Sequence, residues 1–400
     1  MNVQKLKEEV YLHLTQDLIP FWRNLRDNAH GGYYGLMDFN YNVDKKAIKG
    51  CILNSRITWF FSNAYTLLKD KSLLEEAEHG FRFLKEHCWD KANGGVFWSV
   101  QYDGTPEETL KHTYNQAFSI YALSSYYEAS GDKEALDMAY QLYELIETKM
   151  RDELGYKEAF DETFREIDNE KLSENGVMAQ KTMNTLLHVF EAYTELYRVD
   201  NNPEVKEKLM WIMDVFAEKV YNPELHRQEV FFDDEWNSIL DLHSYGHDIE
   251  TAWLIDRGVE VIGEEDYTKK MLPITKDLTR QIFEVAFDGS SLANECENGV
   301  VNVDRIWWVQ AETLLGFLNG YEKCGEEGEE AHKYLDAALN VWEYIKKHVI
   351  DNHSKYREWY EVLDAEGRPY NKPMVQPWKC PYHNGRMCME VIKRIDVYSR

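Results

Sequence analysis

Two histidines in this sequence begin helical segments and have the chemistry to move protons. His247 opens a helical pattern over 247–263, and His383 opens one over 382–395. An imidazole has an unperturbed pKa of about 6.5, so two of them on either side of a substrate can act as base and acid near neutral pH. Glu250 lies three residues after His247 on the same helical face. We expect its carboxylate to fix the tautomer of His247 and raise its basicity.

Arg56 brings a permanent positive charge to the same set of helix starts. A guanidinium placed where an enolate oxygen gains negative charge is among the largest contributions that a protein makes to catalysis. Polar groups on a buried helix face destabilise the fold unless they are hydrogen bonded or serve a function. Polar residues recur at the same depth in several of these helices, which predicts one functional site. The other polar and aromatic residues in the first two turns of these helices are Tyr114, Asn115, Asn184, His188, Trp308, Glu312 and Arg386.

Two other chemistries stay open for these residues. His243, His247 and Glu250 have metal-ligating side chains, but their order differs from H-E-x-x-H and no compact set of aspartates accompanies them. Glu250 and Glu312 could instead be the carboxylate pair of a glycosidase. The histidine content of the predicted site disfavours that reaction. We expect neither a metal nor another cofactor.

Helical periodicity positions these residues. Apolar residues recur at intervals of three and four along most of the chain, which indicates amphipathic helices. Pro273 lacks a backbone N–H, so we expect a kink or a break within 265–287. The predicted helices cover residues 2–26, 55–68, 73–88, 113–130, 133–150, 181–199, 203–221, 247–263, 265–287, 306–320, 329–350 and 382–395.

Short segments rich in glycine and aromatic residues separate successive helix pairs. Examples are residues 31–35 and 94–98, and the unit recurs about every 60 to 75 residues. A helix pair cannot bury its apolar face alone. The repeat therefore predicts an all-α (α/α)6 barrel of six helical hairpins, as a single domain over residues 1–400. We expect short β-hairpins or loops at the active-site mouth.

The distribution of polar residues separates inner from outer helices. Segments such as 73–88 and 133–150 carry Glu and Lys on one side, as outer helices do. The helices that begin near 55, 113, 181, 247, 306 and 382 are apolar on more than one face, so we expect them inside. Parallel inner helices direct their N-termini to one mouth, where free N–H groups favour an oxygen-rich ligand.

Composition limits the partners of this chain. The 400 residues carry a formal net charge of −26, which disfavours nucleic acid and anionic membrane surfaces. Aromatic residues make up 14%, and their rings suit stacking on sugars. The cysteines are scattered, and neither a secretory leader nor a run of about 18 apolar residues is present, so we expect a reduced, cytoplasmic protein. We also expect a monomer, since no uncovered apolar stripe is evident.

Seven stretches of sequence connect this chain to a known family. The chain resembles the N-acylglucosamine 2-epimerase family, and within it the enzymes that act on disaccharides. The resemblance runs through essentially the whole chain. The matching stretches are Ser55-Arg56-Ile57, Lys111-His112-Thr113-Tyr114-Asn115-Gln116-Ala117-Phe118, Ser173-Glu174-Asn175-Gly176, Lys181-Thr182-Met183-Asn184, Ser244-Tyr245-Gly246-His247-Asp248-Ile249-Glu250, Trp307-Trp308-Val309-Gln310-Ala311-Glu312 and Trp378-Lys379-Cys380-Pro381-Tyr382-His383-Asn384-Gly385-Arg386.

The resemblance implies the (α/α)6 fold, no metal or nucleotide, and a role for each residue of the site. It assigns acid–base catalysis to His247 and His383, ring opening or substrate orientation to His188, enediolate stabilisation to Arg56, and support of His247 to Glu250. The residues implied in substrate binding are Tyr114, Asn184 and Glu312 for the hydroxyls, Trp308 and Trp378 for stacking on the sugars, and Trp253 for the pocket wall.

The implied substrate is a β-1,4-linked disaccharide with a free reducing end, such as cellobiose or lactose. Removal and return of the C2 proton would convert its reducing-end glucose to mannose through a cis-enediolate. Return of the proton at C1 would give a ketose as a side product. A monosaccharide aldose–ketose isomerase and an N-acylglucosamine 2-epimerase stay open as alternatives on the same fold. A glycosidase and a non-catalytic sugar-binding protein are further alternatives.

Overall fold

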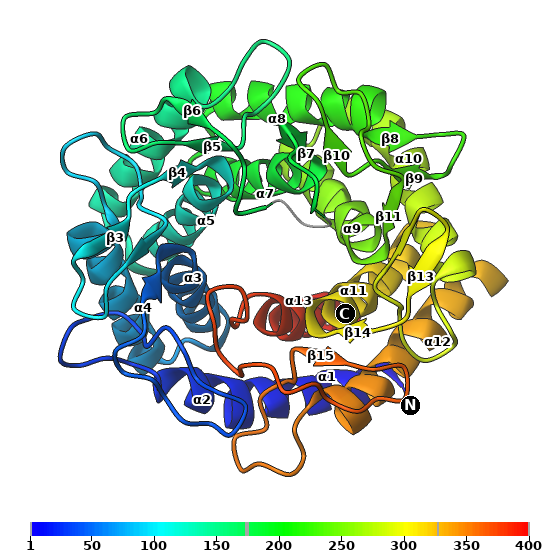
Figure 1. Cartoon of the computed structure of the whole chain (residues 1–400). Helices are drawn as coiled ribbons and strands as arrows, with labels where there is room; N and C mark the ends of the chain where they lie inside the picture. Colours follow the sequence, from blue (N-terminus) through cyan, green and yellow to red (C-terminus); the bar gives the residue numbers. More distant parts are fainter. Residues whose placement is uncertain (1, 173–175, 326–327, 399–400) are drawn as a thin grey trace.

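Apolar residues on more than one face place six helices on the inside of a ring (Figure 1). The computed structural model describes residues 2–172, 176–325 and 328–398. The inner helices are α3 (Cys51–Leu68), α5 (Thr113–Ser130), α7 (Met183–Asp200), α9 (Tyr245–Ile262), α11 (Trp307–Cys324) and α13 (His383–Tyr398). They are the six that the sequence predicts to be inner.

Outer helices pack around this inner ring, and the two ends of the chain meet. The outer segments are α1–η1–α2 (Val3–Leu12, His13–Leu18 and Ile19–Arg23), α4–η2 (Lys71–Phe83 and Leu84–Cys88), α6 (Lys133–Lys149), α8–η4 (Pro203–Val215 and Phe216–Val220), α10 (Glu265–Val285) and α12–η5 (Glu329–Tyr344 and Ile345–Val349). The α1 helix packs against α13, so the N-terminal helix completes the pair that the C-terminal helix begins. The prediction of an (α/α)6 barrel is confirmed.

Pro273 does not interrupt α10, so the expectation of a break within 265–287 is wrong. A proline inside a helix removes the hydrogen bond to the carbonyl four residues earlier, here that of Lys269. Both residues are exposed on the outside of the ring, where water can bind the freed carbonyl. The irregular turns lie elsewhere: the η segments, which end three of the outer helices, are π-helical. No helix in the described ranges is long and apolar enough to cross a membrane.

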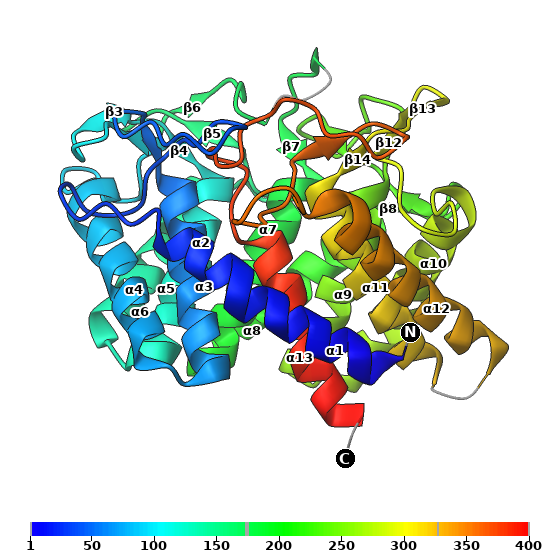
Figure 2. The same cartoon turned by 90° about the horizontal axis from the view of Figure 1, so that it is seen from below.

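Small antiparallel sheets lie at one end of the barrel, together with the long loops (Figure 2). A short strand precedes each of five inner helices and pairs with a strand that follows the next outer helix, as in Lys49↔Val100. Hairpins extend several of these sheets, as in the pairing Ser99↔Glu108, which confirms the expected hairpins. The strands are β1 (Lys49–Gly50), β2 (Ser99–Val100), β3 (Pro106–Glu108), β4 (Lys111–His112), β5 (Ala159–Phe160), β6 (Glu166–Ile167), β7 (Lys181–Thr182), β8 (Tyr221–Asn222), β9 (Arg227–Gln228), β10 (Phe231–Phe232), β11 (Leu242–Ser244), β12 (Glu295–Glu297), β13 (Val300–Asn302), β14 (Arg305–Ile306) and β15 (Val362–Leu363).

A buried basic residue two positions before an inner helix fastens most of these hairpins. The Nζ of Lys49 lies 2.7 Å from Asp27 Oδ2, and the Nζ of Lys111 lies 2.7 Å from Asp90 Oδ2. A buried charge is stable only when it is paired and hydrogen bonded. The carboxylates belong to the turns after the outer helices, so each pair holds a turn against the start of an inner helix. The equivalent pairs are Lys181–Asp152 and Arg305–Asp288. Before α9 the basic residue is His243, and its partner Asp248 lies in the first turn of α9 itself.

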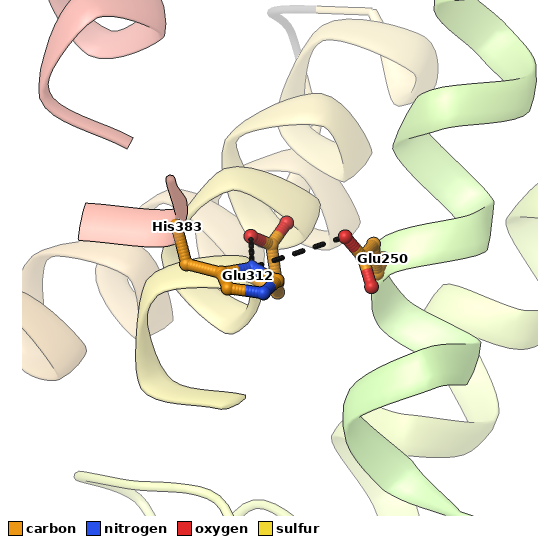
Figure 3. A group of neighbouring side chains, drawn as sticks. All are labelled: Glu250, Glu312 and His383. Carbon is orange, nitrogen blue, oxygen red and sulfur yellow. Dashed lines mark hydrogen bonds and ion pairs between the residues drawn. The ribbon is translucent and has the colours of Figure 1, made fainter. Parts of the chain in front are cut away.

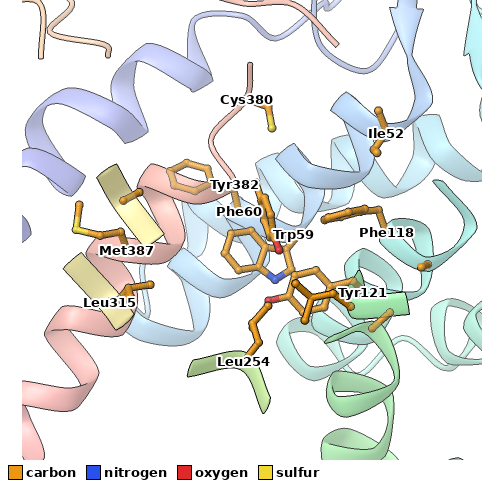
Figure 4. Close-up of a cluster of buried hydrophobic side chains, with 14 of the residues drawn as sticks. Ile52, Trp59, Phe60, Phe118, Tyr121, Leu254, Leu315, Cys380, Tyr382 and Met387 are labelled. Carbon is orange, nitrogen blue, oxygen red and sulfur yellow. The ribbon is translucent and has the colours of Figure 1, made fainter. Parts of the chain in front are cut away.

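Aromatic side chains form a large part of a buried hydrophobic cluster inside the barrel (Figure 4). Trp59 stacks on Tyr121 with ring centroids 5.3 Å apart and meets the edge of Tyr382 at 5.5 Å. Phe118 meets Tyr382 at 5.0 Å. These rings come from α3, α5 and the segment before α13. Dense packing of this kind gives the polar groups above it a rigid base.

Candidate active site

A cavity of about 530 Å³ opens at the end of the barrel that carries the hairpins. It contains nine of the eleven residues predicted for the site. The two predicted residues that do not line it are Trp253 and Glu312. The nine are Arg56, Tyr114, Asn184, His188, His247, Glu250, Trp308, Trp378 and His383. The N-termini of the inner helices therefore converge as the sequence predicts.

His247 begins the first turn of α9 and is half-buried. Its Nδ1 lies 2.7 Å from the Oγ of Ser244, and its ring lies against Trp308 with centroids 4.9 Å apart. Burial, and then the nearby His188, lower the pKa of His247 to about 3. The imidazole is therefore neutral near pH 7, and one of its nitrogens can accept a proton.

His383 begins α13, and its ring lies against the same tryptophan, Trp308. Its ring centroid lies 5.4 Å from that of Trp308. Its Nδ1 lies 2.7 Å from Oε1 of Glu312 and 3.9 Å from Oε1 of Glu250 (Figure 3). Burial, followed by the charges of Arg386 and Arg56, lowers the pKa of His383 well below its usual value. Both candidate acid–base groups are thus neutral imidazoles.

Arg386 is the centre of the buried charge network beneath the cavity. One of its terminal nitrogens donates to Glu250 and to Glu312, and the other donates to Glu191 and to the hydroxyl of Tyr382. The ligand-type atoms of Glu250, Glu312 and His383 lie within 4.8 Å of one another, as in a cation site. However, the guanidinium already binds both carboxylates.

The expected support of His247 by Glu250 is wrong. Oε1 of Glu250 accepts from Arg386, and Oε2 makes no hydrogen bond with any described residue. Burial first, and the neighbouring Glu312 second, raise the pKa of Glu250 well above its usual value. Arg386, from another helix, donates a charge-assisted hydrogen bond to Glu250. The hydroxyl of Ser244 takes its expected place beside His247.

The structure arranges neither of the two alternative residue sets as its chemistry requires, the metal-ligating trio or the carboxylate pair of a glycosidase. His243 Nε2 lies 2.8 Å from Asp248 Oδ2, and this buried pair is not part of the cavity lining, so the trio of His243, His247 and Glu250 is not assembled as a metal site. Glu250 and Glu312 share one guanidinium, and Glu312 is fully buried. A glycosidase needs its two carboxyl groups on opposite sides of the scissile bond. This pair does not have that arrangement.

His188 has a carboxylate partner on its own helix. Its Nδ1 lies 3.0 Å from Oε2 of Glu191, three residues later on α7. Burial alone would raise the pKa of Glu191, but Arg386 and His188 hold it below its usual value. The ring of His188 meets the edge of Tyr114 at 5.0 Å. Burial lowers the pKa of His188, so it too is a neutral group.

Arg56 is a buried cation whose side chain forms no ion pair within the described ranges. Its terminal nitrogens donate to the hydroxyl of Tyr114 at 2.7 Å and to the sulfur of Cys380 at 3.8 Å. Its guanidinium carbon lies 4.0 Å from the centroid of Phe118. A buried positive charge without a carboxylate partner stabilises an anion formed in the cavity.

Of the remaining predicted residues, some line the cavity and the others lie outside its lining. Trp308, Trp378, Tyr114 and Asn184 line the cavity, and Asn184 Oδ1 is buried without a hydrogen-bond partner among the described residues. Trp253 was expected in the pocket wall but is fully enclosed in the core. Its Nε1 donates to Glu312 Oε2 at 2.9 Å. Glu312, expected to bind sugar hydroxyls, instead orients His383.

Sequence reasoning missed four residues of this site: Ser244, Glu191, Tyr382 and Arg386, the last noted only for its helical depth. Glu191 has a detectable signal, since it follows His188 at the helical spacing of three. Tyr382 and Arg386 show a similar signal, because they are four residues apart at the start of α13. Ser244 also precedes His247 by three residues, but a serine at a helix N-terminus ordinarily caps its own helix, so this spacing does not predict their partnership.

Comparisons with known proteins agree with this geometry. The family model of N-acylglucosamine 2-epimerase matches residues 31–385. The chain belongs to the N-acylglucosamine 2-epimerase family. A relative in this family, the cellobiose 2-epimerase of Eubacterium cellulosolvens, is 49% identical over 96% of this chain and 98% of its own. The predicted family and the enzyme class of sugar epimerases are confirmed.

Two more distant members of the N-acylglucosamine 2-epimerase family show how the identity decreases within the family. The solved structure of cellobiose 2-epimerase from Bacillus thermoamylovorans has a TM-score of 0.92 and 43% identity, covering 98% of this chain and 100% of that one. The N-acylglucosamine 2-epimerase of Homo sapiens is 21% identical, over 98% of this chain and 91% of its own. Of the stretches that carry the family resemblance, Ser173-Glu174-Asn175 lie outside the described residues.

Proposed function

We propose that this protein is a cellobiose 2-epimerase. It would convert the reducing-end glucose of a β-1,4-linked disaccharide to mannose, reversibly and through a cis-enediolate. The observation that carries this proposal is the pair of neutral imidazoles, His247 and His383, which pack against the same indole of Trp308. Two bases that line one cavity from different helices suit a reaction that removes a proton from one face of a carbon and returns it to the other.

The first step needs the open-chain aldehyde, because only the carbonyl at C1 makes the C2 proton acidic. His188 would assist ring opening or orient the open chain, with Glu191 holding its Nδ1. One neutral imidazole then takes the C2 proton on its Nε2. The electron pair of the broken C–H bond forms the C1–C2 double bond, and the former carbonyl oxygen becomes an oxyanion.

Arg56 would stabilise that oxyanion. It is a buried charge with no carboxylate to neutralise it among the described residues, and it faces the cavity beside Tyr114. Rotation about C2–C3 then turns the other face of the enediolate to the second histidine. That imidazole takes up a proton from solvent on its Nε2 and delivers it to C2, so that the mannose epimer forms and the first histidine releases its proton to solvent. Return to C1 gives the ketose, so some isomerisation accompanies epimerisation.

Room for a second sugar ring supports a disaccharide substrate. Besides the histidines, the cavity is lined by the half-buried Trp378, Gln376 and Glu361. Its volume of about 530 Å³ lies within the range of about 300–1,000 Å³ that is usual for ligand pockets. The higher identity to cellobiose epimerases than to the human N-acylglucosamine enzyme supports the same choice.

Three further parts of the proposal concern the whole chain. We infer that residues 1–400 form one catalytic domain, that it acts as a monomer, and that it works in the cytoplasm. The contact of α1 with α13 supports the first of these, because a ring that closes on its own termini folds as a unit. The six free cysteines, four of them buried, support a reducing compartment.

Product analysis tests the proposed function directly. Cellobiose is incubated with the protein in the presence of EDTA, and the reducing sugar is identified by NMR. We expect a mannose-type reducing end and little or no free glucose. Release of glucose would indicate hydrolysis, and an unchanged disaccharide with turnover of free mannose would indicate a monosaccharide isomerase. Either result would contradict the proposal.

A further inference from the structure

Ser244 stands at the N-cap of α9 but does not cap it. Its backbone is extended, as an N-cap residue requires, yet its side chain accepts no hydrogen bond from the first turn. Its Oγ instead lies 2.7 Å from Nδ1 of His247. Serine is a preferred N-cap residue because its oxygen satisfies one of the free N–H groups of the helix. Here that oxygen is directed to a ring of the site.

Other helices of the barrel show the ordinary arrangement. Thr182 caps α7 by accepting from the backbone N–H of Thr185, and Asp132 caps the outer helix α6 by accepting from that of Glu134. Among the serine, threonine, aspartate and asparagine N-cap residues of the described helices, Ser244 alone makes no cap bond, and it lines the cavity. The exception occurs on the helix whose first turn carries a candidate acid–base histidine.

We propose that Ser244 is a positioning residue for His247. Its hydroxyl oxygen accepts the Nδ1 proton, which fixes one tautomer and leaves the Nε2 lone pair toward the cavity, ready to take a proton from substrate. This inference rests on the proposed epimerase function and names a residue of the same site. It also explains the missing cap, because one oxygen lone pair aimed at the ring is turned away from the helix N–H groups.

The partner of His247 differs in kind from those of the other two histidines. His383 and His188 are held by the carboxylates of Glu312 and Glu191, whereas His247 is held by a neutral hydroxyl. A hydroxyl orients the ring without adding a negative charge that would favour imidazolium. The titratable groups around His247 are His188 on α7, Glu312 on α11, His383 across Trp308 on α13, and Glu295 opposite Ser244 on β12.

Two substitutions with opposite expected effects test this role. Ser244→Ala removes the hydroxyl but no cap bond, so we expect kcat on cellobiose to fall about ten- to a hundredfold, with KM and Tm nearly unchanged. Asp132→Ala removes a real cap far from the cavity, so we expect Tm to fall by about 1–2 °C with kcat unchanged. Ser244→Thr keeps the hydroxyl, and we expect it to restore most of kcat.

A spectroscopic measurement separates this inference from the epimerase proposal. In protein labelled with ¹⁵N histidine, we expect His247 to show a protonated Nδ1 and an unprotonated Nε2. Ser244→Ala should mix the two tautomers, Ser244→Thr should restore the wild-type signals, and the signals of His383 should not move. This readout needs no substrate, so it stands even if cellobiose is not turned over. Unchanged His247 signals in Ser244→Ala, or a kcat within twofold of wild type, would overturn the role of Ser244.

Discussion

Oε1 of Glu312 lies 2.7 Å from Nδ1 of His383, and the same carboxylate binds Arg386 and the indole of Trp253. Three donors on one buried carboxylate fix its plane, and the plane fixes the imidazole. Oε1 of Glu312 also accepts from Arg386, so it acts as an acceptor toward His383, which places the proton of His383 on Nδ1 and leaves Nε2 free. The orientation of His383 is thus set by residues that never touch the cavity.

Replacing Glu312 with glutamine should therefore reduce catalysis with little effect on substrate binding. The amide keeps the shape of the side chain but removes its charge and offers an N–H where His383 needs an acceptor. We expect kcat to fall about 10²- to 10⁴-fold, the size of an acid–base contribution, with KM within a few fold of wild type. Steady-state kinetics on cellobiose measures both values. Glu284→Gln, on the exposed face of α10, is the matched control, and an equal loss there would contradict the assignment.

Catalysis should be sensitive to replacement of Arg56 even by a residue that keeps the positive charge. Lysine at this position cannot span from Tyr114 to the site of the oxyanion with two donors, as a guanidinium can. We expect Arg56→Lys to raise the activation barrier by about 3 kcal/mol, which is roughly a hundredfold or more in kcat. The same variant should slow the exchange of the C2 proton with solvent. Normal exchange with lost epimerisation would place Arg56 outside the enediolate step.

Trp378 should act on binding of the distal sugar rather than on chemistry. Its ring lines the cavity, 5.6 Å from Trp98 and 6.0 Å from Tyr114, and offers a flat apolar face. We expect Trp378→Ala to raise KM for cellobiose about tenfold or more, with a smaller change in kcat. Trp378→Phe should recover part of the affinity. A kcat loss larger than the KM change would indicate that the indole positions the reacting ring.

The neutral histidines should make the fold sensitive to acid. In the unfolded chain an imidazole titrates near pH 6.5, whereas the pKa of His247 in the folded protein is about 3. The unfolded state therefore binds more protons below pH 6.5, and stability falls as the pH falls from 6.5 toward 3. Urea unfolding between pH 7 and 5 measures this. His247→Asn should weaken the dependence by about one proton, or roughly 1.4 kcal/mol per pH unit, and an unchanged slope would contradict the lowered pKa.

The fold could be predicted from the sequence because the barrel repeats a local signal. Apolar residues at intervals of three and four define the helices, and a recurring turn marks each hairpin, so inner and outer helices separate by their polar faces. The expected break at Pro273 is wrong because of the position of α10 in the fold. A helix on the outside of the ring can leave the carbonyl of Lys269 to water and continue.

The site could be predicted as a set of residues but not as a set of contacts. His247 and Glu250 have the helical spacing that joins His188 to Glu191, yet only the second pair forms. Arg386, from another helix, binds both carboxylates, but Glu191 keeps its second oxygen for His188, whereas the Nδ1 of His247 is held by Ser244. Glu312 and His383 are likewise far apart in sequence and meet only because α11 and α13 are neighbours in the ring. Such pairings depend on tertiary packing and have no local pattern.

The direct test of the two-histidine account is C2 hydrogen exchange by single-histidine variants in D₂O. His247→Asn and His383→Asn are each incubated with cellobiose and, separately, with its mannose epimer, and deuterium at C2 is followed by NMR. The account predicts that neither variant interconverts the epimers, and that each still exchanges the C2 proton of one epimer only, with opposite choices. A variant that keeps epimerising, or that exchanges both epimers alike, would contradict the account.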